Sequence, residues 1–131
     1  MHLKAVKLYL VDVQIFGTSK SKDTQKALRF FKERGLKPNY VDLQKREIAP
    51  GELKRFVQKF GTDALVDSSG KAYADAGLEY LRVSDEQLLD KLCENPKLMV
   101  QPLLRSGKTL SVGWDEQLWR GIYDSSKSQG V

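Results

Sequence analysis

The chain has 131 residues, the length of one ordinary domain with a single core, and its composition excludes several kinds of protein. Hydrophobic residues make up 40% and charged residues 30%, which is the balance of a globular domain and not of a disordered or fibrous chain. No apolar run approaches the roughly 20 residues that a membrane-spanning helix requires. Asp12 interrupts the apolar N-terminal segment and no small-residue cleavage site follows, so we expect a cytoplasmic protein without a signal peptide.

Cysteine and histidine each occur once, as Cys93 and His2. An intramolecular disulfide, a Cys-x-x-Cys couple and a thiolate–imidazole metal site are therefore excluded, and we expect no metal and no cofactor. The net charge of +5 divides into +8 for residues 1–61 and −3 for residues 62–131. A solvated basic helix face is the simpler explanation, and attraction of an acidic partner is the alternative. Basic and aromatic residues do not interleave as in single-strand binders, so we expect no direct contact with nucleic acid.

The first third of the chain has the pattern of a βαβ unit. Apolar residues on both phases over residues 6–16 predict a strand covered on both faces. Helical spacing predicts a helix over 23–34, which Gly35 ends in the C′ position. Pro38 then precedes a second extended segment over 39–43.

The remaining two thirds are expected to contain mainly helices, with one β-hairpin before the last helix. The expected elements, in order, are a helix from Pro50 to Phe60, short turns or a small helix over 62–82, a helix opened by a capping box at Ser84–Gln87 and stopped at Asn95–Pro96, a strand over 98–104 interrupted by Pro102, a hairpin turn at Ser106–Gly107 with a return strand over 108–113, a helix from Asp115, and a mobile polar tail over 124–131. This order predicts an α/β protein of thioredoxin-like fold. One domain over residues 1–131 would combine βαβ and ββα halves in a mixed four-stranded sheet, with a helical insertion at about 47–95.

The apolar stripes of these helices are expected to form the core. The expected buried residues are Leu53, Phe56, Val57 and Phe60 in the second helix, Leu88, Leu89 and Leu92 in the third, and Leu118, Trp119, Ile122 and Tyr123 in the last. Trp114 and Trp119 should close the edge of the core, whereas an exposed Trp114 would indicate a surface for a partner.

The junction between the first strand and the first helix is the strongest candidate site. Free N–H groups of a helix's first turn attract anions, and Ser19, Lys20, Ser21 and Lys22 would add two hydroxyls and two ammonium groups there. The stretch is not a phosphate loop, because the second glycine of that motif is missing. A simpler alternative is an N-cap by Ser21 or Ser19 beside solvated lysines.

Three segments carry a resemblance to a known family. They are Ile15–Ala27, then Phe60–Val66 with Tyr73 and Gly77–Leu78, and finally Asn95–Leu103 with its continuation Leu110–Glu116. In order and spacing they resemble the ArsC-type arsenate reductase and Spx family over about residues 13–123. The resemblance implies a thioredoxin-like fold and a cis peptide bond before Pro102.

The resemblance also implies that the family's functional positions are largely replaced here. The redox cysteine corresponds to Ser21 and the second cysteine of Spx-type switches to Thr24, while the oxyanion-binding arginines correspond to positions near Asp63, at Gln101 and near Gly113. A serine hydroxyl does not substitute for the thiol, because its pKa lies far above the thiol's value of roughly 8.5 and oxygen forms no disulfide. Gln101 then joins the four turn residues as a candidate anion ligand.

Two further positions have a functional and a structural interpretation. In Spx-type regulators the glycine matching Gly61 belongs to the surface that touches the C-terminal domain of the RNA polymerase α-subunit, but a C′ glycine that ends a helix is a sufficient explanation and the favoured one. Cys93 lies beside the apolar stripe of the third helix and not at a helix N-terminus, so we expect a structural cysteine and no redox role.

Three functional hypotheses follow from these observations. The first is a non-catalytic, monomeric family member that acts through protein contacts or anion binding. The second is a glutathione- and glutaredoxin-dependent reductase of the arsenate reductase type, which requires a cysteine in place of Ser21 or a thiol from a redox partner protein. The third is an Spx-like transcription regulator that binds RNA polymerase and lacks the redox switch.

Overall fold

The computed structural model describes residues 12–129 of the chain, with side chains to Ser126. Residues 1–11, which include His2 and most of the strand expected over 6–16, lie outside the described residues. The chain divides into two compact units, one made of the residues up to Asp42 and from Gln101 onward, the other of Leu43–Val100. The helical insertion expected over about 47–95 falls within the second unit. No helix of the described part has the length and apolar character needed to cross a membrane.

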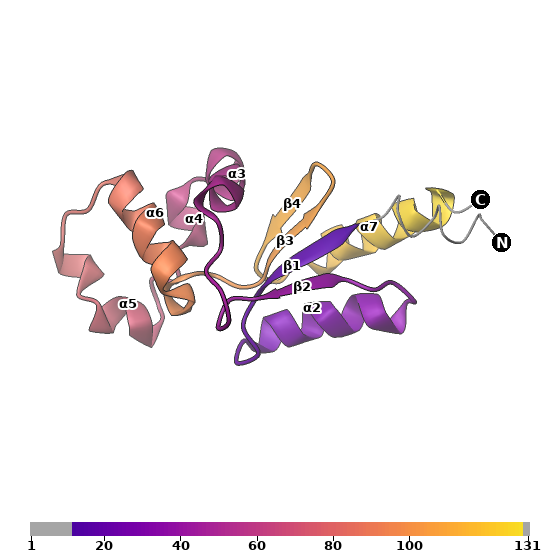
Figure 1. Ribbon diagram of the computed structural model, residues 1–131, viewed down its shortest axis with the longest axis horizontal. Helices are drawn as coiled ribbons and strands as arrows, with labels where there is room; N and C mark the ends of the chain where they lie inside the picture. Colours follow the sequence, from indigo (N-terminus) through magenta and orange to yellow (C-terminus); the bar gives the residue numbers. More distant parts are fainter. Residues whose placement is uncertain (1–11, 130–131) are drawn as a thin grey trace. The chain divides into compact units, whose positions relative to one another are not determined.

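The first unit contains a four-stranded mixed sheet in the order β2-β1-β3-β4 (Figure 1). Its strands are β1 (Val13–Gly17), β2 (Asn39–Asp42), β3 (Leu103–Ser106) and β4 (Thr109–Val112). β1 pairs parallel with β2 and antiparallel with β3, and β3 pairs antiparallel with β4. The predicted thioredoxin-like arrangement of a βαβ half and a ββα half is therefore confirmed.

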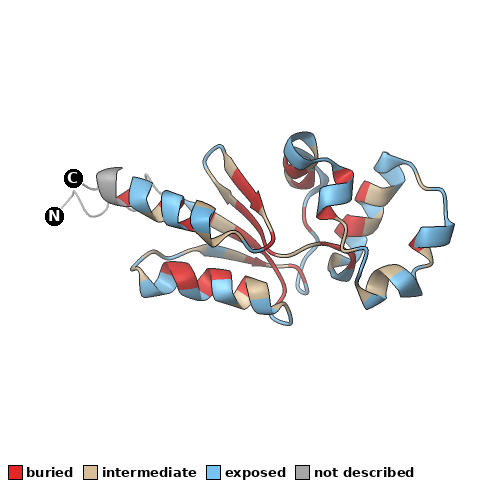
Figure 2. Cartoon of the chain, turned by 180° about the vertical axis from the view of Figure 1, so that it is seen from behind, coloured by how far each residue is buried: buried red, intermediate tan, exposed pale blue. Residues whose placement is uncertain are grey.

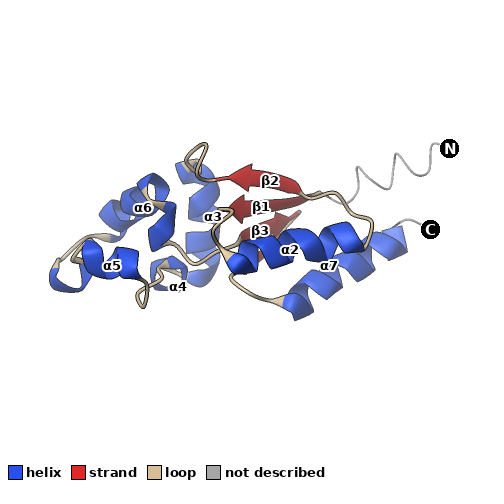
Figure 3. Cartoon of the chain, turned by 90° about the horizontal axis from the view of Figure 1, so that it is seen from below, coloured by secondary structure: helices blue, strands red, loops and turns tan. Residues whose placement is uncertain are grey.

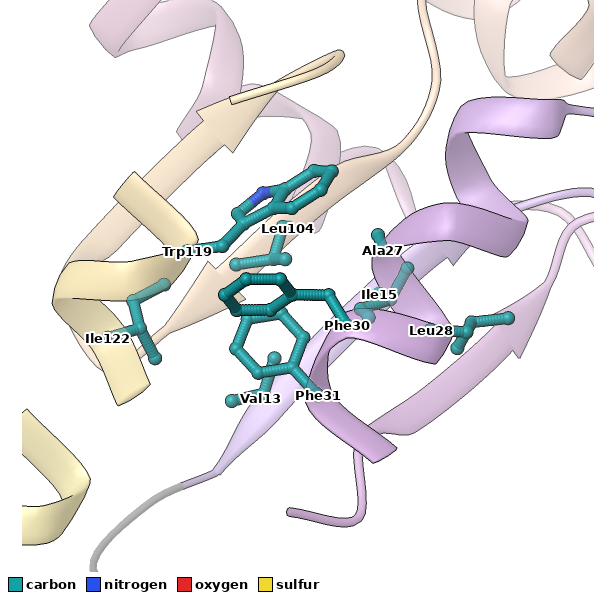
Figure 4. Close-up of a cluster of buried hydrophobic side chains, with 9 residues drawn as sticks. All are labelled: Val13, Ile15, Ala27, Leu28, Phe30, Phe31, Leu104, Trp119 and Ile122. Atoms are coloured by element: carbon teal, nitrogen blue, oxygen red, sulfur yellow. The ribbon is translucent and has the colours of Figure 1, made fainter. Parts of the chain in front are cut away.

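Two helices, α2 (Lys22–Glu33) and α7 (Glu116–Gln129), cover the same face of this sheet (Figure 3). The core between them contains aliphatic side chains from the sheet and aromatic side chains from the helices (Figure 4). Its buried members are Val13, Ile15, Ala27, Leu28, Phe30, Phe31, Leu104, Trp119 and Ile122. Phe30 and Phe31 meet edge to face at 5.0 Å between ring centroids, and Phe30 lies 5.8 Å from Trp119.

α2 has capped ends that fix its length. Ser21 is its N-cap residue, and Gly35, with a φ of 80°, lies just beyond its C-cap. The N–H of Leu36 donates to the carbonyl of Phe31 at 3.0 Å and that of Gly35 donates to Lys32 at 3.1 Å. These two bonds form a Schellman motif, so the predicted helix stop at Gly35 is confirmed.

The second unit is helical, with inward-facing stripes of buried residues (Figure 2). Its elements are α3 (Pro50–Phe60), α4 (Thr62–Leu65), α5 (Lys71–Asp75), η1 (Leu78–Tyr80), α6 (Asp85–Glu94) and η2 (Pro96–Leu98). The capping box at the start of α6 is present as predicted, with the Ser84 hydroxyl accepting from Gln87 N–H and the Gln87 side chain accepting from Ser84 N–H.

Some predicted boundaries were wrong. The apolar run over 98–104 does not form one strand: Met99 makes only an isolated bridge with Val66, and β3 begins at Leu103, after the Gln101–Pro102 peptide bond, which is cis. The hairpin turn is Gly107–Lys108, one residue later than expected.

Corrections also apply to helix faces and to the C-terminal end. Phe60 is 36% exposed, because it occupies the last position of α3, and Leu88 is only half-buried while Cys93 takes its place in the buried stripe of α6. The segment expected as a tail from residue 124 is helical as far as Gln129. Ser126 is buried there, with its hydroxyl donating to the carbonyl of Tyr123 at 2.7 Å, as a helical residue does.

Candidate functional site

The junction of β1 and α2 holds the candidate site. β1 ends at Gly17, and the chain turns so that Ser21 N–H donates to the carbonyl of Thr18 at 3.1 Å. Ser21 has extended backbone angles (φ −82°, ψ 116°), and its hydroxyl oxygen accepts from Thr24 N–H at 3.2 Å. Of the two predicted capping residues, Ser21 is therefore the one used.

Thr24, one turn further along α2, is fully buried. A Cβ added at Gly17 would lie 2.7 Å from Thr24 Cγ2 and closer still to its Oγ1, so β1 and the first turn of α2 are in close contact. Thr24 Oγ1 has no hydrogen-bond partner among the described residues. The position is therefore packed against the strand and closed to a ligand.

Gln101 lies against the same turn although it is 83 residues away in the sequence. Its side-chain oxygen accepts from Thr18 N–H at 2.8 Å and from the Thr18 hydroxyl at 3.2 Å. The neighbouring Pro102 is buried. The fold thus links Gln101 through Thr18 to the turn in which Ser21 caps Thr24. Thr18 was not among the predicted site residues, because no local pattern connects it with Gln101.

The remaining candidate anion ligands face solvent. Ser19, Lys20 and Lys22 are exposed. Lys20 and Lys22 form no ion pair within the part of the chain that the structure describes. They raise the positive potential at the start of α2, but the carboxylate of Asp23 stands in the same first turn and opposes it. An anion here would have to compete with that carboxylate.

The other two predicted positions belong to the second unit. Gly61 ends α3 with a φ of 84°, is exposed, and donates its N–H to the carbonyl of Val57 at 2.8 Å. Asp63, near one of the family's arginine positions, is exposed on α4, whereas Gly113 is buried in the first unit with a φ of 72°.

Cys93 is buried in α6, and its surroundings oppose ionisation. Burial raises the pKa of the thiol, and the nearby carboxylates of Asp90, Glu47 and Glu94 raise it further. A protonated, buried thiol is a poor nucleophile. Among the described residues, no cluster of three or more His, Cys, Asp or Glu side chains is placed to hold a metal ion.

These features define a thioredoxin-like domain whose strand–turn–helix junction has a serine N-cap. Residues 16–122 match the model of the ArsC family, so the chain belongs to the ArsC family. The chain is similar to the protein named Global transcriptional regulator Spx 2 from Oceanobacillus iheyensis, with 27% identity over 106 residues that cover 79% of this chain and 78% of that protein.

Solved structures support the fold. An arsenate reductase from Vibrio cholerae superposes with a TM-score of 0.74 at 22% identity, covering 86% of this chain and 98% of that one. An arsenate reductase related protein from Brucella melitensis gives a TM-score of 0.61 at 18% identity, covering 84% and 92% respectively. At these identities the likeness establishes the fold and does not extend to activity.

Proposed function

We propose that this ArsC-family protein is redox-inactive and acts by binding another protein, in the manner of an Spx-type regulator without a redox switch. The observation that carries the proposal is the environment of Ser21. Its oxygen stands at the family's thiol position and accepts a hydrogen bond from Thr24 N–H, as an N-cap residue does. A serine there has no redox chemistry, and the buried Cys93 has a raised pKa.

Three further observations support a binding role over catalysis. The curated relative is named as a transcriptional regulator and is matched over more than three quarters of both chains. The resemblance aligns the arginines that would hold arsenate with Gln101 and with positions near Asp63 and Gly113, none of which is a cation. Gln101 instead accepts hydrogen bonds from Thr18 through its side-chain oxygen. An arginine could not do so, because its guanidinium group has no acceptor.

The partner we propose is the C-terminal domain of the RNA polymerase α-subunit, contacted by the surface around Gly61. The glycine is exposed, and apart from its two chain neighbours no atom of the described residues lies within 4 Å of where its Cβ would be, so the backbone here is open to approach. Protein contact is favoured over anion binding because the carboxylate of Asp23 stands in the turn where the anion would sit.

Calorimetric titration of that purified polymerase domain into this protein tests the proposal. Binding should be unchanged by oxidant or reductant and lost in Gly61→Arg. Gly35→Arg is the matched control, since Gly35 has nearly the same φ (80° against 84°) and equally open surroundings, so backbone strain is comparable. No binding to the wild type, binding that requires oxidation, or equal loss in both variants would contradict the proposal.

Anion binding is tested separately by thermal melting in sulfate. A rise in melting temperature that Lys20→Ala abolishes would favour the anion hypothesis over the contact hypothesis. Equal rises in melting temperature in the wild type and in Lys20→Ala would refute an anion site at this turn, and capping of α2 would then be its only assigned role.

A further inference from the structure

The first unit has a second surface feature, a shallow groove between α2 and the start of α7. Its volume is about 300 Å³. Phe30 and Trp114 form its aromatic part, and charged side chains of both helices surround them. The predicted role of Trp114 as a closure of the core edge is wrong in part, because this side chain is 47% exposed whereas Trp119 is fully buried.

The aromatic part of the groove is held by the core beneath it. Trp114 packs edge to face on Trp119 with 4.9 Å between ring centroids, and Phe30 lies 5.8 Å from the same Trp119 ring. Figure 4 shows Phe30 and Trp119 among the core side chains. An exposed aromatic ring anchored in this way offers apolar contact area at little further cost in side-chain entropy, which is a property of binding surfaces.

The charges of the groove are predominantly positive. Four cationic side chains line it, against the two carboxylates of Glu33 and Glu116. Three of the cations lie over its rings: Lys26 is 5.2 Å from the Trp114 centroid, and Arg34 and Arg120 are 3.8 and 5.9 Å from the Phe30 centroid.

Two of the arginines, Arg120 and Arg29, differ in whether a carboxylate neutralises them. Arg120 is paired with Glu116, with its Nη2 and Nε atoms 2.7 and 3.0 Å from one carboxylate oxygen. Arg29 is exposed and forms no ion pair within the described part of the chain. The groove therefore retains an unneutralised guanidinium beside an exposed tryptophan, which complements a carboxylate next to an apolar side chain.

We propose that this groove docks an acidic segment of a partner protein, with an apolar side chain of the segment against Trp114 and its carboxylates on Arg29 and the stacked cations. A peptide fits better than a nucleic acid, because Glu33 and Glu116 would repel a closely spaced row of phosphates, whereas separated peptide carboxylates avoid them. The groove lies in the first unit and Gly61 in the second, so the proposal is independent of the polymerase contact.

The probe is a fluorescein-labelled peptide, Glu-Asp-Leu-Phe-Glu-Asp, titrated into the full chain and followed by fluorescence anisotropy. We expect saturable binding, with an affinity that Arg29→Glu and Trp114→Ala each reduce about fivefold or more. The affinity should also fall as added salt screens the charges. The neutral peptide Gln-Asn-Leu-Phe-Gln-Asn should bind at least about fivefold more weakly, because it lacks the carboxylates.

Lys108→Glu is the matched control. It makes the same charge change on the exposed β3–β4 turn of the same unit, outside the groove lining, and should leave the affinity within about twofold. Circular dichroism checks that each variant is folded. The proposal is overturned by no saturable binding, by equal weakening in Arg29→Glu and Lys108→Glu, or by a labelled oligothymidylate binding at the groove where the peptide does not.

Discussion

Gly17→Ala probes the contact on which the site's geometry depends, between the end of β1 and the first turn of α2. The new methyl group would lie 2.7 Å from Thr24 Cγ2 and closer still to Oγ1, with Thr24 Cβ at 3.1 Å. Both residues are buried, and the hydrogen bond from Thr24 N–H to Ser21 holds this turn in place. Overpacking of this kind costs about 1–3 kcal/mol, because backbone or rotamers must shift to admit the methyl group.

The assay is urea unfolding followed by tryptophan fluorescence. Trp114 and Trp119 are the only tryptophans of the chain, and both belong to the unit that contains Gly17. A loss of this size lowers the unfolding midpoint by about 1 M. Gly121→Ala on α7 is the control in the same unit: apart from its chain neighbours and the nearby backbone of α7, no atom of the described residues lies within 4 Å of its added Cβ, so the substitution should stabilise by about 0.5–1 kcal/mol.

A double variant separates the clash from any effect of alanine itself. Thr24→Ala removes the two nearest of the three atoms that the new methyl group would meet and leaves Cβ, so it should restore part of the stability lost in Gly17→Ala. If Gly17→Ala proved as stable as Gly121→Ala, the close packing of Thr24 on the strand would be refuted, and with it the view that this position is closed to ligands.

Three further predictions concern the first turn of α2 and the buried thiol of α6. Thr24→Val should stabilise by about 1 kcal/mol in urea unfolding, because it replaces a buried hydroxyl that has no partner among the described residues, and a loss of similar size would show that the hydroxyl is bonded in solution. Ser21→Cys in a Cys93→Ser background should give a thiol whose alkylation by iodoacetamide has a pH midpoint below about 8.5, since the start of α2 favours the thiolate, and a midpoint above that value would contradict the assigned helix field. Cys93 should show the reverse, with a midpoint above about 8.5, because burial and neighbouring carboxylates raise its pKa. An unfolded cysteine ionises first as the pH rises, so the contribution of Cys93 to stability should fall above that pH, and Cys93→Ala should remove this part of the pH dependence.

Local chemistry made much of the fold predictable. Helix α2 followed from the spacing of Ala27, Leu28, Phe30 and Phe31, and its end followed from Gly35, because periodicity and a left-handed glycine act within a few residues. The start of α6 followed from its Ser84 capping box for the same reason.

Features decided by distant residues were not predictable. The apolar run around Met99 has the composition of a strand, but its backbone bonds lie with the second unit: Val100 N–H donates to Leu65 and Asp67 N–H to Leu98, both at 2.8 Å. Nothing in the sequence indicated that Gln101 would accept from Thr18, because that contact depends on how β1 and the cis-Pro102 segment meet. The serine at the helix start was visible in the sequence, whereas its hydrogen bonding required the structure.

The redox inactivity proposed for this protein is tested most directly by an arsenate turnover assay. The assay contains the wild-type chain, glutathione, glutaredoxin and an NADPH-coupled reductant system. Because Ser21 caps α2 and the thiol of Cys93 is buried with a raised pKa, NADPH consumption should equal that of the blank without the protein. A rate well above the blank that is abolished by Cys93→Ser or by Ser21→Ala would contradict the account, because a side chain of this chain would then carry the chemistry.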